Sequence, residues 1–420
     1  MDPLTHLLTG WLLVRALPDR WRGGDGRLRV GGLWLPTVAV VAALLPDAVE
    51  ALIGPKPSED LVRWLNSERG WSHGVLGASL SAAALWAATL PTARGDRQTG
   101  RWAAGWSPGR AAVAAFGGVG LHLLWDALTP LGLRPLYPFS GAWVRGDLVL
   151  PGDPWVHLIL LSGVGLTLWR EELGRWGAWS ILAAVAVWLL AKGAVGELLI
   201  GRPPDELLVP LLAAGVWLVG TLHVLVLRRW RRWPRAPLIA AGLVAAFLAA
   251  SLTFNALAGG VAVEATRVEL ALPQSQDYRP LAVRPTGILP WERLAVVGVR
   301  LQPEPFVPAD ARFASVKEVR LARRPPGWRF QRYVVTRGGW YRGHDLIERA
   351  GLTEDERVRA WRAWSRFPNT SPYLWEDCIS LMDGPFLPAS LDRRGRTLQI
   401  APPPEKAAEL RAEWLALQSD

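Results

Sequence analysis

The first 258 residues alternate between long apolar runs and short polar connections, and this pattern predicts a helical membrane domain. Several of the runs approach the roughly 20 residues that an α-helix needs to cross a bilayer. The first and fifth runs are shorter, so they suit partial or re-entrant segments as well as full spans. The apolar runs cover residues 4–17, 33–53, 74–90, 111–129, 155–169, 177–200, 207–227 and 237–258.

The pattern changes after residue 258, where charged residues and prolines become frequent and apolar positions begin to alternate. Such alternation is typical of half-buried strands. Thr353-Glu-Asp-Glu356 has the form of a capping box that opens a helix, and a last helix is expected after Pro404. The sequence thus predicts a mainly α protein with a polytopic transmembrane domain over 1–258 and an α+β extramembrane domain over 259–420. Strands are expected at Val261–Leu272, Leu294–Leu301, Ser315–Leu321 and Trp328–Val335.

The arginines assign an orientation to these predicted spans. They concentrate in every second connection, namely 18–32, 91–110, 170–176 and 228–235. Connections rich in Lys and Arg face the cytoplasm, so the N-terminus and the C-terminal domain are both expected outside. The formal net charge of +10 does not indicate nucleic acid binding, because the positive residues flank apolar runs and no nucleic-acid-binding motif is present.

Ionisable residues within the apolar runs are the candidates for function. His122 and Asp126 lie four residues apart, about one helical turn, in Gly120-Leu-His-Leu-Leu-Trp-Asp-Ala-Leu-Thr-Pro130. Neither belongs in hydrocarbon without a partner. On the orientation set by the arginines, the other candidates fall near the same membrane face. The full set is His6, Asp47, His73, His122, Asp126 and Asp153.

Three histidines and three carboxylates together suit a divalent metal. Zn²⁺ is the commonest ion for such ligands, and Mn²⁺ or Fe²⁺ also fit. Six candidates exceed what one tetrahedral ion needs, so two ions bridged by an aspartate are an alternative. Each residue alone also has a simpler interpretation: Asp47 and Asp153 as turn residues, and His6 and His73 as interfacial residues or caps. The single cysteine, Cys378, excludes a cysteine-based zinc site.

The motifs around these residues resemble a known family. Met-Asp-Pro-Leu-Thr-His6, Leu-Pro-Asp47, Arg-Gly-Trp-Ser-His73, Leu-His122-Leu-Leu-Trp-Asp126 and Pro-Phe-Ser140 follow its order. The chain is similar, over about residues 1–170, to the bacterial membrane-bound metal-dependent hydrolases, which include LexA-regulated members. That family is related in proposed fold to the helical bundles of zinc-dependent phospholipase C and nucleases.

The resemblance implies metal-dependent hydrolysis with His6, Asp47, His73, His122 and Asp126 as ligands, and Asp153 matches an Asp-Pro that often follows Pro-Phe-Ser. The family pattern His-Arg-Gly-x-Thr-His is altered here, because Glu68 replaces its first histidine. Glu68 can ligate a metal or act as a general base, and it is the candidate catalytic residue. The alternative is that the replacement abolishes activity.

Together these observations predict a membrane-bound, metal-dependent hydrolase of an ester or phosphoester in an amphiphilic substrate. Metal-activated water would be the nucleophile, and Glu68 or Asp153 would accept its proton. The alternative is a non-catalytic metal-binding membrane protein, a sensor or assembly factor, that uses its outer domain for recognition. A transporter ranks last, because the polar candidates do not continue through the full membrane depth.

Overall fold

In a computed structural model of the chain, the first compact unit is a helical bundle and the second contains two antiparallel sheets. The first unit comprises Met1–Gly54, Arg69–Leu252 and Gly287–Pro290. The second unit comprises Pro55–Glu68, Thr253–Thr286 and Trp291–Asp420. The predicted boundary at 258/259 stays a prediction. The residues described are 3–17, 34–55, 61–99, 107–171, 236–270, 277–285, 293–300, 315–324, 327–336, 351–364, 368–373, 378–383, 397–400, 403, 404, 406 and 408.

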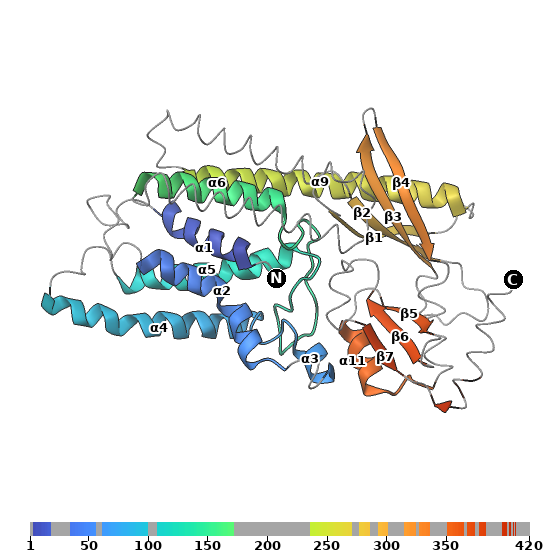
Figure 1. The fold of residues 1–420 in the computed structure, drawn as a ribbon, viewed down its shortest axis with the longest axis horizontal. Coiled ribbons are helices and arrows are strands. Elements are labelled where there is room, and N and C mark those ends of the chain that lie inside the picture. Colours follow the sequence, from blue (N-terminus) through green and yellow to red (C-terminus); the bar gives the residue numbers. More distant parts are fainter. Residues whose placement is uncertain are drawn as a thin grey trace. The chain divides into compact units, whose positions relative to one another are not determined.

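Helices of the first unit follow the predicted apolar runs, and they lie side by side (Figure 1). Six predicted segments are confirmed as helical within a few residues of their expected starts, whereas the segments at 177–200 and 207–227 lie outside the described residues. The helices are α1 (Pro3–Ala16), α2 (Trp34–Ile53), α4 (Val75–Thr99), α5 (Pro108–Leu128), α6 (Pro154–Glu171) and α9 (Ala236–Leu270), of which α9 continues into the second unit.

Three of the described helices are long and apolar enough to cross a membrane: α2, α5 and the Pro237–Glu264 part of α9. Val75–Pro91 in α4 and Trp155–Val164 in α6 form shorter apolar helices. Helix α1 has only 14 residues, which is about 21 Å at 1.5 Å per residue, less than the hydrocarbon thickness of roughly 30 Å. The short first run is therefore a short helix.

Small residues bring α1, α2 and α5 close together. A Cβ built on Gly10 would lie 2.8 Å from the carbonyl oxygen of Ala39, and one on Gly118 would lie 2.5 Å from the same oxygen. Ala39, Ala42 and Ala43 on α2 are fully buried. Membrane helices commonly pack through such small residues, because lipid tails offer no hydrophobic driving force for association.

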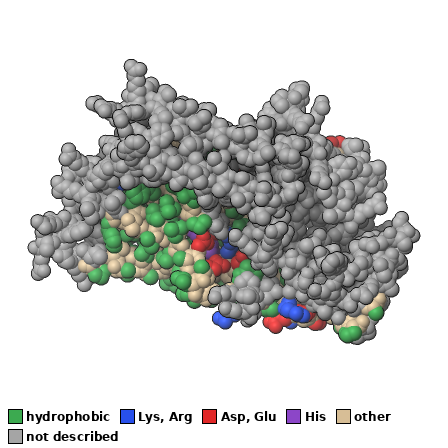
Figure 2. Space-filling model, viewed as in Figure 1, with side chains coloured by type: hydrophobic (Ala, Val, Ile, Leu, Met, Phe, Trp, Pro, Cys, Tyr) green, Lys and Arg blue, Asp and Glu red, His purple; other side chains and the backbone are tan. Residues whose placement is uncertain are grey.

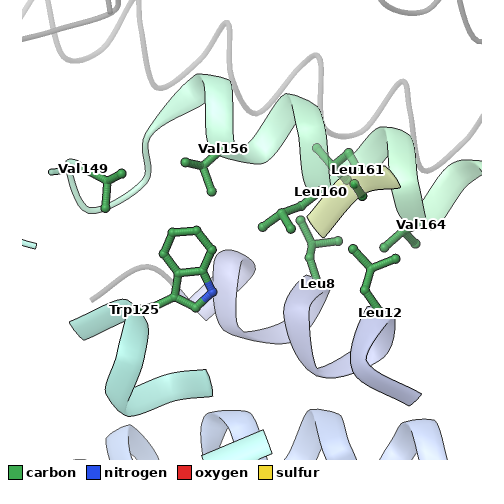
Figure 3. Close-up of a cluster of buried hydrophobic side chains, with 9 residues drawn as sticks. Leu8, Leu12, Trp125, Val149, Val156, Leu160, Leu161 and Val164 are labelled. Carbon is green, nitrogen blue, oxygen red and sulfur yellow. The ribbon is translucent and has the colours of Figure 1, made fainter. Parts of the chain in front are cut away.

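A second core joins α1 and α5 to α6 (Figure 3). Trp125 of α5 lies between the helices, with its ring near Val149 and Val156. Leu8 and Leu12 of α1 complete the cluster with Leu160, Leu161 and Val164 of α6. These contacts fix the N-terminal helix, which carries His6, against the C-terminal turns of α5.

The second unit has two antiparallel sheets, which supports the predicted α+β class. The first has the order β1-β2-β3-β4 and the second β5-β6-β7, while helix α3 (Leu61–Ser67) packs on α11 (Glu356–Trp364). The strands predicted at 315–321 and 328–335 are confirmed within β3 and β4, and the strand predicted at 294–301 is confirmed in β2 as far as Arg300. The strands are β1 (Asp277–Pro285), β2 (Arg293–Arg300), β3 (Ser315–Arg324), β4 (Gly327–Thr336), β5 (Pro368–Tyr373), β6 (Cys378–Asp383) and β7 (Thr397–Ile400).

Two local predictions for this part of the chain are wrong. The predicted strand at 261–272 is helical as far as Leu270, because α9 continues to that residue, and Ala258 and Ala262, one turn apart, are buried in a cluster with Ala295 of β2. The helix after Thr353 begins later than the capping box predicts, at Glu356. Asp355 caps it, because its Oδ1 accepts the backbone N–H of Arg357 at 2.8 Å. Positions 404, 406 and 408 of the predicted last helix are helical, and its remainder lies outside the described residues.

Candidate metal centre

Four predicted ligands from three separate stretches meet at one end of the helical bundle. Asp47 lies near the C-terminal end of α2, His73 precedes the first residue of α4, and His122 and Asp126 lie in the last turns of α5. One ligand atom from each of the four lies within 4.8 Å of the others, and this group could hold a metal ion. His73, His122 and Asp126 are fully buried.

The spacing of the ligand atoms suits a single small cation. His73 Nε2 lies 3.2 Å from Asp47 Oδ1, 3.2 Å from Asp126 Oδ2 and 3.1 Å from His122 Nε2. His122 Nε2 lies 3.6 Å from Asp126 Oδ2 and 3.7 Å from Asp47 Oδ1. Ligands bound at 2.0–2.1 Å in a tetrahedron are about 3.4 Å apart, so these distances are close to those of a zinc site.

The ends of α5 and the start of α4 fix the positions of these residues. Ser107 accepts the backbone N–H of Arg110 and Pro108 begins α5, while Thr129 and Pro130 end it directly after the Asp126 turn. Gly74 starts the turn into α4 beside His73, and a Cβ there would lie 2.9 Å from the carbonyl oxygens of both Gly70 and Tyr137. Glycine is thus required where the chain enters α4.

Both ligand histidines are oriented by a partner on their other nitrogen. His122 Nδ1 donates to the carbonyl oxygen of Ala43 at 2.7 Å, which leaves Nε2 directed toward the group. His73 Nδ1 lies 3.0 Å from Glu50 Oε2, and its Nε2 also faces the group. Metal-binding histidines usually have such a partner on the second nitrogen, because it fixes the tautomer and the ring orientation.

Glu50 is a residue that the sequence reasoning missed. Its Oε1 accepts the backbone N–H of Arg69 at 3.0 Å, and its Oε2 accepts the Ser72 hydroxyl at 3.1 Å. It therefore holds the 69–73 turn and the His73 ring together. The signal for it was its position three residues after Asp47, about one turn along the same helix face.

Arg69 is the second residue that the sequence reasoning missed. Its Nη1 lies 3.2 Å from Asp126 Oδ2 and donates to the carbonyl oxygen of Gly132 at 2.7 Å. The residue has a φ of 52°, in the left-handed region that non-glycine residues seldom adopt. The motif Arg-Gly-Trp-Ser-His73 contains Arg69, but its sequence does not indicate that the guanidinium reaches α5.

His6 borders the group from α1 and was also predicted as a ligand. Its ring stacks on that of His122 with the centroids 3.9 Å apart, and its Nε2 lies 3.5 Å from Asp126 Oδ1. His6 is fully buried. The structure thus places five of the predicted ligands together, although His6 is not one of the four whose ligand atoms form the compact group.

The carboxylates around His73 strongly favour a positive charge between them. Burial alone would lower the pKa of His73, but Asp126, Asp47 and Glu50 together raise it to about 10. Arg69 is the one cationic side chain that directly contacts an acidic member of the described cluster, against three carboxylates. A divalent cation would also compensate the negative charge of these carboxylates, and it would bind His73 in its neutral form.

Asp153 was predicted as a ligand, but the structure gives it another position. Its Oδ1 accepts the backbone N–H groups of Trp155 at 2.9 Å and Val156 at 3.3 Å, so it caps α6. Burial raises the pKa of Asp153. It lies outside the four-residue group. His157, one turn further on, has its Nε2 3.0 Å from the Thr5 hydroxyl.

Glu68, the predicted catalytic residue, is half-buried and follows the last turn of α3. It is not one of the four residues of the compact group, and a metal-binding role for it stays a prediction. Its role as a general base stays a prediction.

The group opens to its surroundings through two carboxylates. The side chains of Asp47 and Glu50 are 29% and 26% exposed, whereas those of His73, His122 and Asp126 are fully buried. Figure 2 shows acidic and basic side chains beside a patch that contains many hydrophobic side chains. Asp47 is thus the partly exposed residue of the four-residue group.

A family comparison supports the membrane assignment. Residues 1–196 match the family described as YdjM inner membrane protein. The match includes all four grouped ligands and His6, and it supports a family of bacterial inner-membrane proteins for this part of the chain. Comparisons with curated proteins and with solved structures gave no match.

Proposed function

We propose that the protein is a metal-dependent hydrolase of the inner membrane that cleaves an ester or phosphoester in an amphiphilic substrate. The observation that carries this proposal is the group of Asp47, His73, His122 and Asp126, whose ligand atoms are spaced as around one ion. Zn²⁺ fits this nitrogen and oxygen set best, and Mn²⁺ or Fe²⁺ are alternatives. A bound divalent cation supplies a Lewis acid and lowers the pKa of coordinated water towards neutral pH.

The residues of the chain have separate roles in this proposal. His73, His122, Asp47 and Asp126 hold the ion, while Glu50 orients the His73 ring and Arg69 orients the Asp126 carboxylate. Both oxygens of Glu50 already accept hydrogen bonds, so Glu50 is a positioning residue. Glu68 remains the candidate proton acceptor, and Asp153, which caps α6, lies outside the four-residue group.

The amphiphilic substrate follows from where the group lies. The metal group lies within the last turns of α2 and α5, which are both long enough to span a membrane. The ends of membrane-spanning helices lie at the depth of the lipid headgroups. Large apolar side chains in the stretches that carry the ligands are exposed, with Trp71 at 56%, two residues before His73, and Ile53 at 80%, at the end of α2. Aromatic side chains are enriched at membrane–water interfaces, where one part of the ring is apolar and another polar.

The orientation in the membrane is part of the same proposal. The arginine-poor connections contain the stretches that flank the metal group, so the group and the C-terminal domain face the outside of the cytoplasmic membrane. A reporter enzyme that is active only outside the cytoplasm, fused after Asp420, should be active.

Metal analysis and turnover of the detergent-purified protein test the function. Wild-type protein should contain a transition metal and hydrolyse a phosphoester or ester probe, and His122→Ala and Asp126→Ala should lose both. Glu68→Gln should keep the metal and lose turnover if Glu68 is the base. Metal binding without turnover of any probe would favour a non-catalytic sensor or assembly factor, and absence of metal would contradict both.

A further inference from the structure

The carboxylate of Asp126 faces two different sets of neighbours. Its Oδ2 lies 3.2 Å from His73 Nε2 and 3.6 Å from His122 Nε2, within the four-residue group. Its Oδ1 lies 3.5 Å from Nε2 of His6, which comes from α1. A carboxylate presented in this way, with one oxygen to each side, can bridge two adjacent cations.

His6 is a buried histidine without a hydrogen bond in the described part of the chain, which is unusual for a polar side chain. It is fully buried, and neither of its ring nitrogens has a hydrogen-bond partner among the described residues. An unsatisfied buried polar group costs about 1–3 kcal/mol, so native proteins seldom retain one without a ligand, ion or water. Neither Asp126 oxygen has a hydrogen bond in the described part of the chain, and Oδ2 pairs with the Arg69 guanidinium whereas Oδ1 faces His6.

We propose that His6 and Asp126 Oδ1 hold a second divalent cation, with Asp126 bridging it to the ion of the four-residue group. The inference rests on the metal centre of the proposed function and extends it from one ion to two. His6 is not needed by the first ion, because Asp47, His73, His122 and Asp126 already supply four ligands. Two protein ligands leave positions on the second cation for solvent or substrate oxygen atoms.

The second cation also defines the charge of the substrate. With neutral histidines, the carboxylates of Asp47, Glu50 and Asp126 exceed the single guanidinium of Arg69 by two charges, which one divalent ion balances. A second divalent ion makes the centre net positive, so it favours an anionic group at the reacting position. Paired metal ions about 3.5–4 Å apart are characteristic of enzymes that cleave phosphoesters. The two-ion centre therefore favours a phosphoester over an uncharged carboxylic ester.

Counting Mn²⁺ bound to the full-length protein in detergent tests this inference without any substrate. Wild type should bind about two ions per chain and His6→Ala about one, because the four-residue group remains intact. The Mn²⁺ spectrum of wild type by electron paramagnetic resonance should show spin coupling between bridged ions, and His6→Ala should give the hyperfine pattern of an isolated ion. His157→Ala removes another fully buried histidine outside the group and should leave the wild-type count.

The possible outcomes separate the two proposals. One uncoupled ion per chain in wild type would overturn the second cation and leave the hydrolase proposal standing. An unchanged count in His6→Ala would also overturn it, because another residue would then hold the second ion. Two coupled ions with no turnover of any probe would support the two-ion centre and contradict the hydrolase, and no bound ion would overturn both.

Discussion

His73 and His122 each direct Nε2 toward the metal group, because another residue fixes Nδ1. For His122 that residue is Ala43, whose carbonyl accepts the Nδ1 proton, and for His73 it is the carboxylate of Glu50. A backbone carbonyl is neutral, whereas a carboxylate also adds negative charge and makes the imidazole a stronger donor to a metal. Glu50 therefore matters to metal affinity although it is not a ligand.

Replacing Glu50 with glutamine should weaken metal binding by about 10- to 100-fold, the usual effect of losing an outer carboxylate partner. The amide keeps the size of the side chain but loses the charge and cannot accept from Arg69, Ser72 and His73 equally well. A competition titration with a fluorescent chelator measures the affinity. Glu354→Gln, at a side chain 88% exposed in the second unit, is the matched control and should leave affinity unchanged. Equal affinities in both variants would contradict the role of Glu50.

Asp153→Ala should destabilise the protein by about 1 kcal/mol without changing its metal content, because the residue caps α6 and lies outside the four-residue group. Asp153→Asn should be nearly neutral. Asparagine keeps an oxygen for the N–H groups of Trp155 and Val156, and burial already disfavours the charged form of Asp153 by raising its pKa.

Thermal unfolding in detergent, together with metal analysis of each Asp153 variant, measures both effects. Loss of metal in Asp153→Asn would mean that the carboxylate belongs to the metal centre after all. This comparison decides between the prediction from sequence and the position seen in the structure.

At the scale of elements, the close packing of α2 and α5 brings Asp47 to His122 and Asp126. Gly118 lies four residues before His122, and a Cβ there would lie 2.5 Å from the backbone oxygen of Ala39 and 2.8 Å from the Cβ of Ala42. Because backbone atoms cannot yield as a flexible side chain can, any larger residue at position 118 must push the two helices apart.

Gly118→Ala should destabilise the bundle by about 1–3 kcal/mol, the usual cost of overpacking a tight core. It should also lower metal affinity, since the helices that carry Asp47 and His122 separate. Gly120→Ala is the matched control on the same helix, because nothing lies within 4 Å of its added Cβ. That variant should be neutral or slightly stabilising, as alanine favours helix over glycine by up to about 1 kcal/mol. Similar unfolding temperatures in the two variants would contradict the packing argument.

The sequence predicted the elements of the first unit well, because long apolar runs leave little choice but helix in a membrane. It also predicted that His122 and Asp126 share a helix face, which is a local consequence of their four-residue spacing. It could not reveal which side chains outside α5 meet them. Arg69 reaches Asp126 only through a left-handed turn, and Glu50 is engaged only because the 69–73 turn folds onto α2.

Two positions show that a local pattern admits more than one structure. The alternation in Val261–Leu272 suits a strand, but the same apolar positions also serve a helix that continues from the preceding span. Asp153 before Pro154 fits a ligand, a turn and a cap equally well in sequence. In the structure, Asp153 Oδ1 accepts the N–H groups of Trp155 and Val156 in the first turn of α6, where helix N–H groups need acceptors from outside the helix, so Asp153 acts as a cap.

For the whole molecule, the metal group ties together segments that are far apart in the chain. Its ligands lie on α2, on the turn before α4 and on α5, and His6 adds α1. An ion that binds the folded arrangement and not the unfolded chain stabilises it by about 2.7 kcal/mol when its free concentration is 100 times Kd. The stabilisation should be confined to the first unit, since the group of ligands in the described residues lies there.

Removing the metal with a chelator should therefore lower the unfolding temperature of the helical unit and leave that of the second unit unchanged. Hydrogen exchange resolves the two units, and protection should fall in α2, α4 and α5 but stay constant in β1–β4. Restoring Zn²⁺ or Mn²⁺ should restore the protection, whereas Mg²⁺ should be less effective, because two histidines suit it poorly. His122→Ala is the control, and chelation should have little effect on it because the group is already incomplete. Equal loss of protection in wild type and His122→Ala would show that the chelator acts elsewhere and would contradict a stabilising metal at this group.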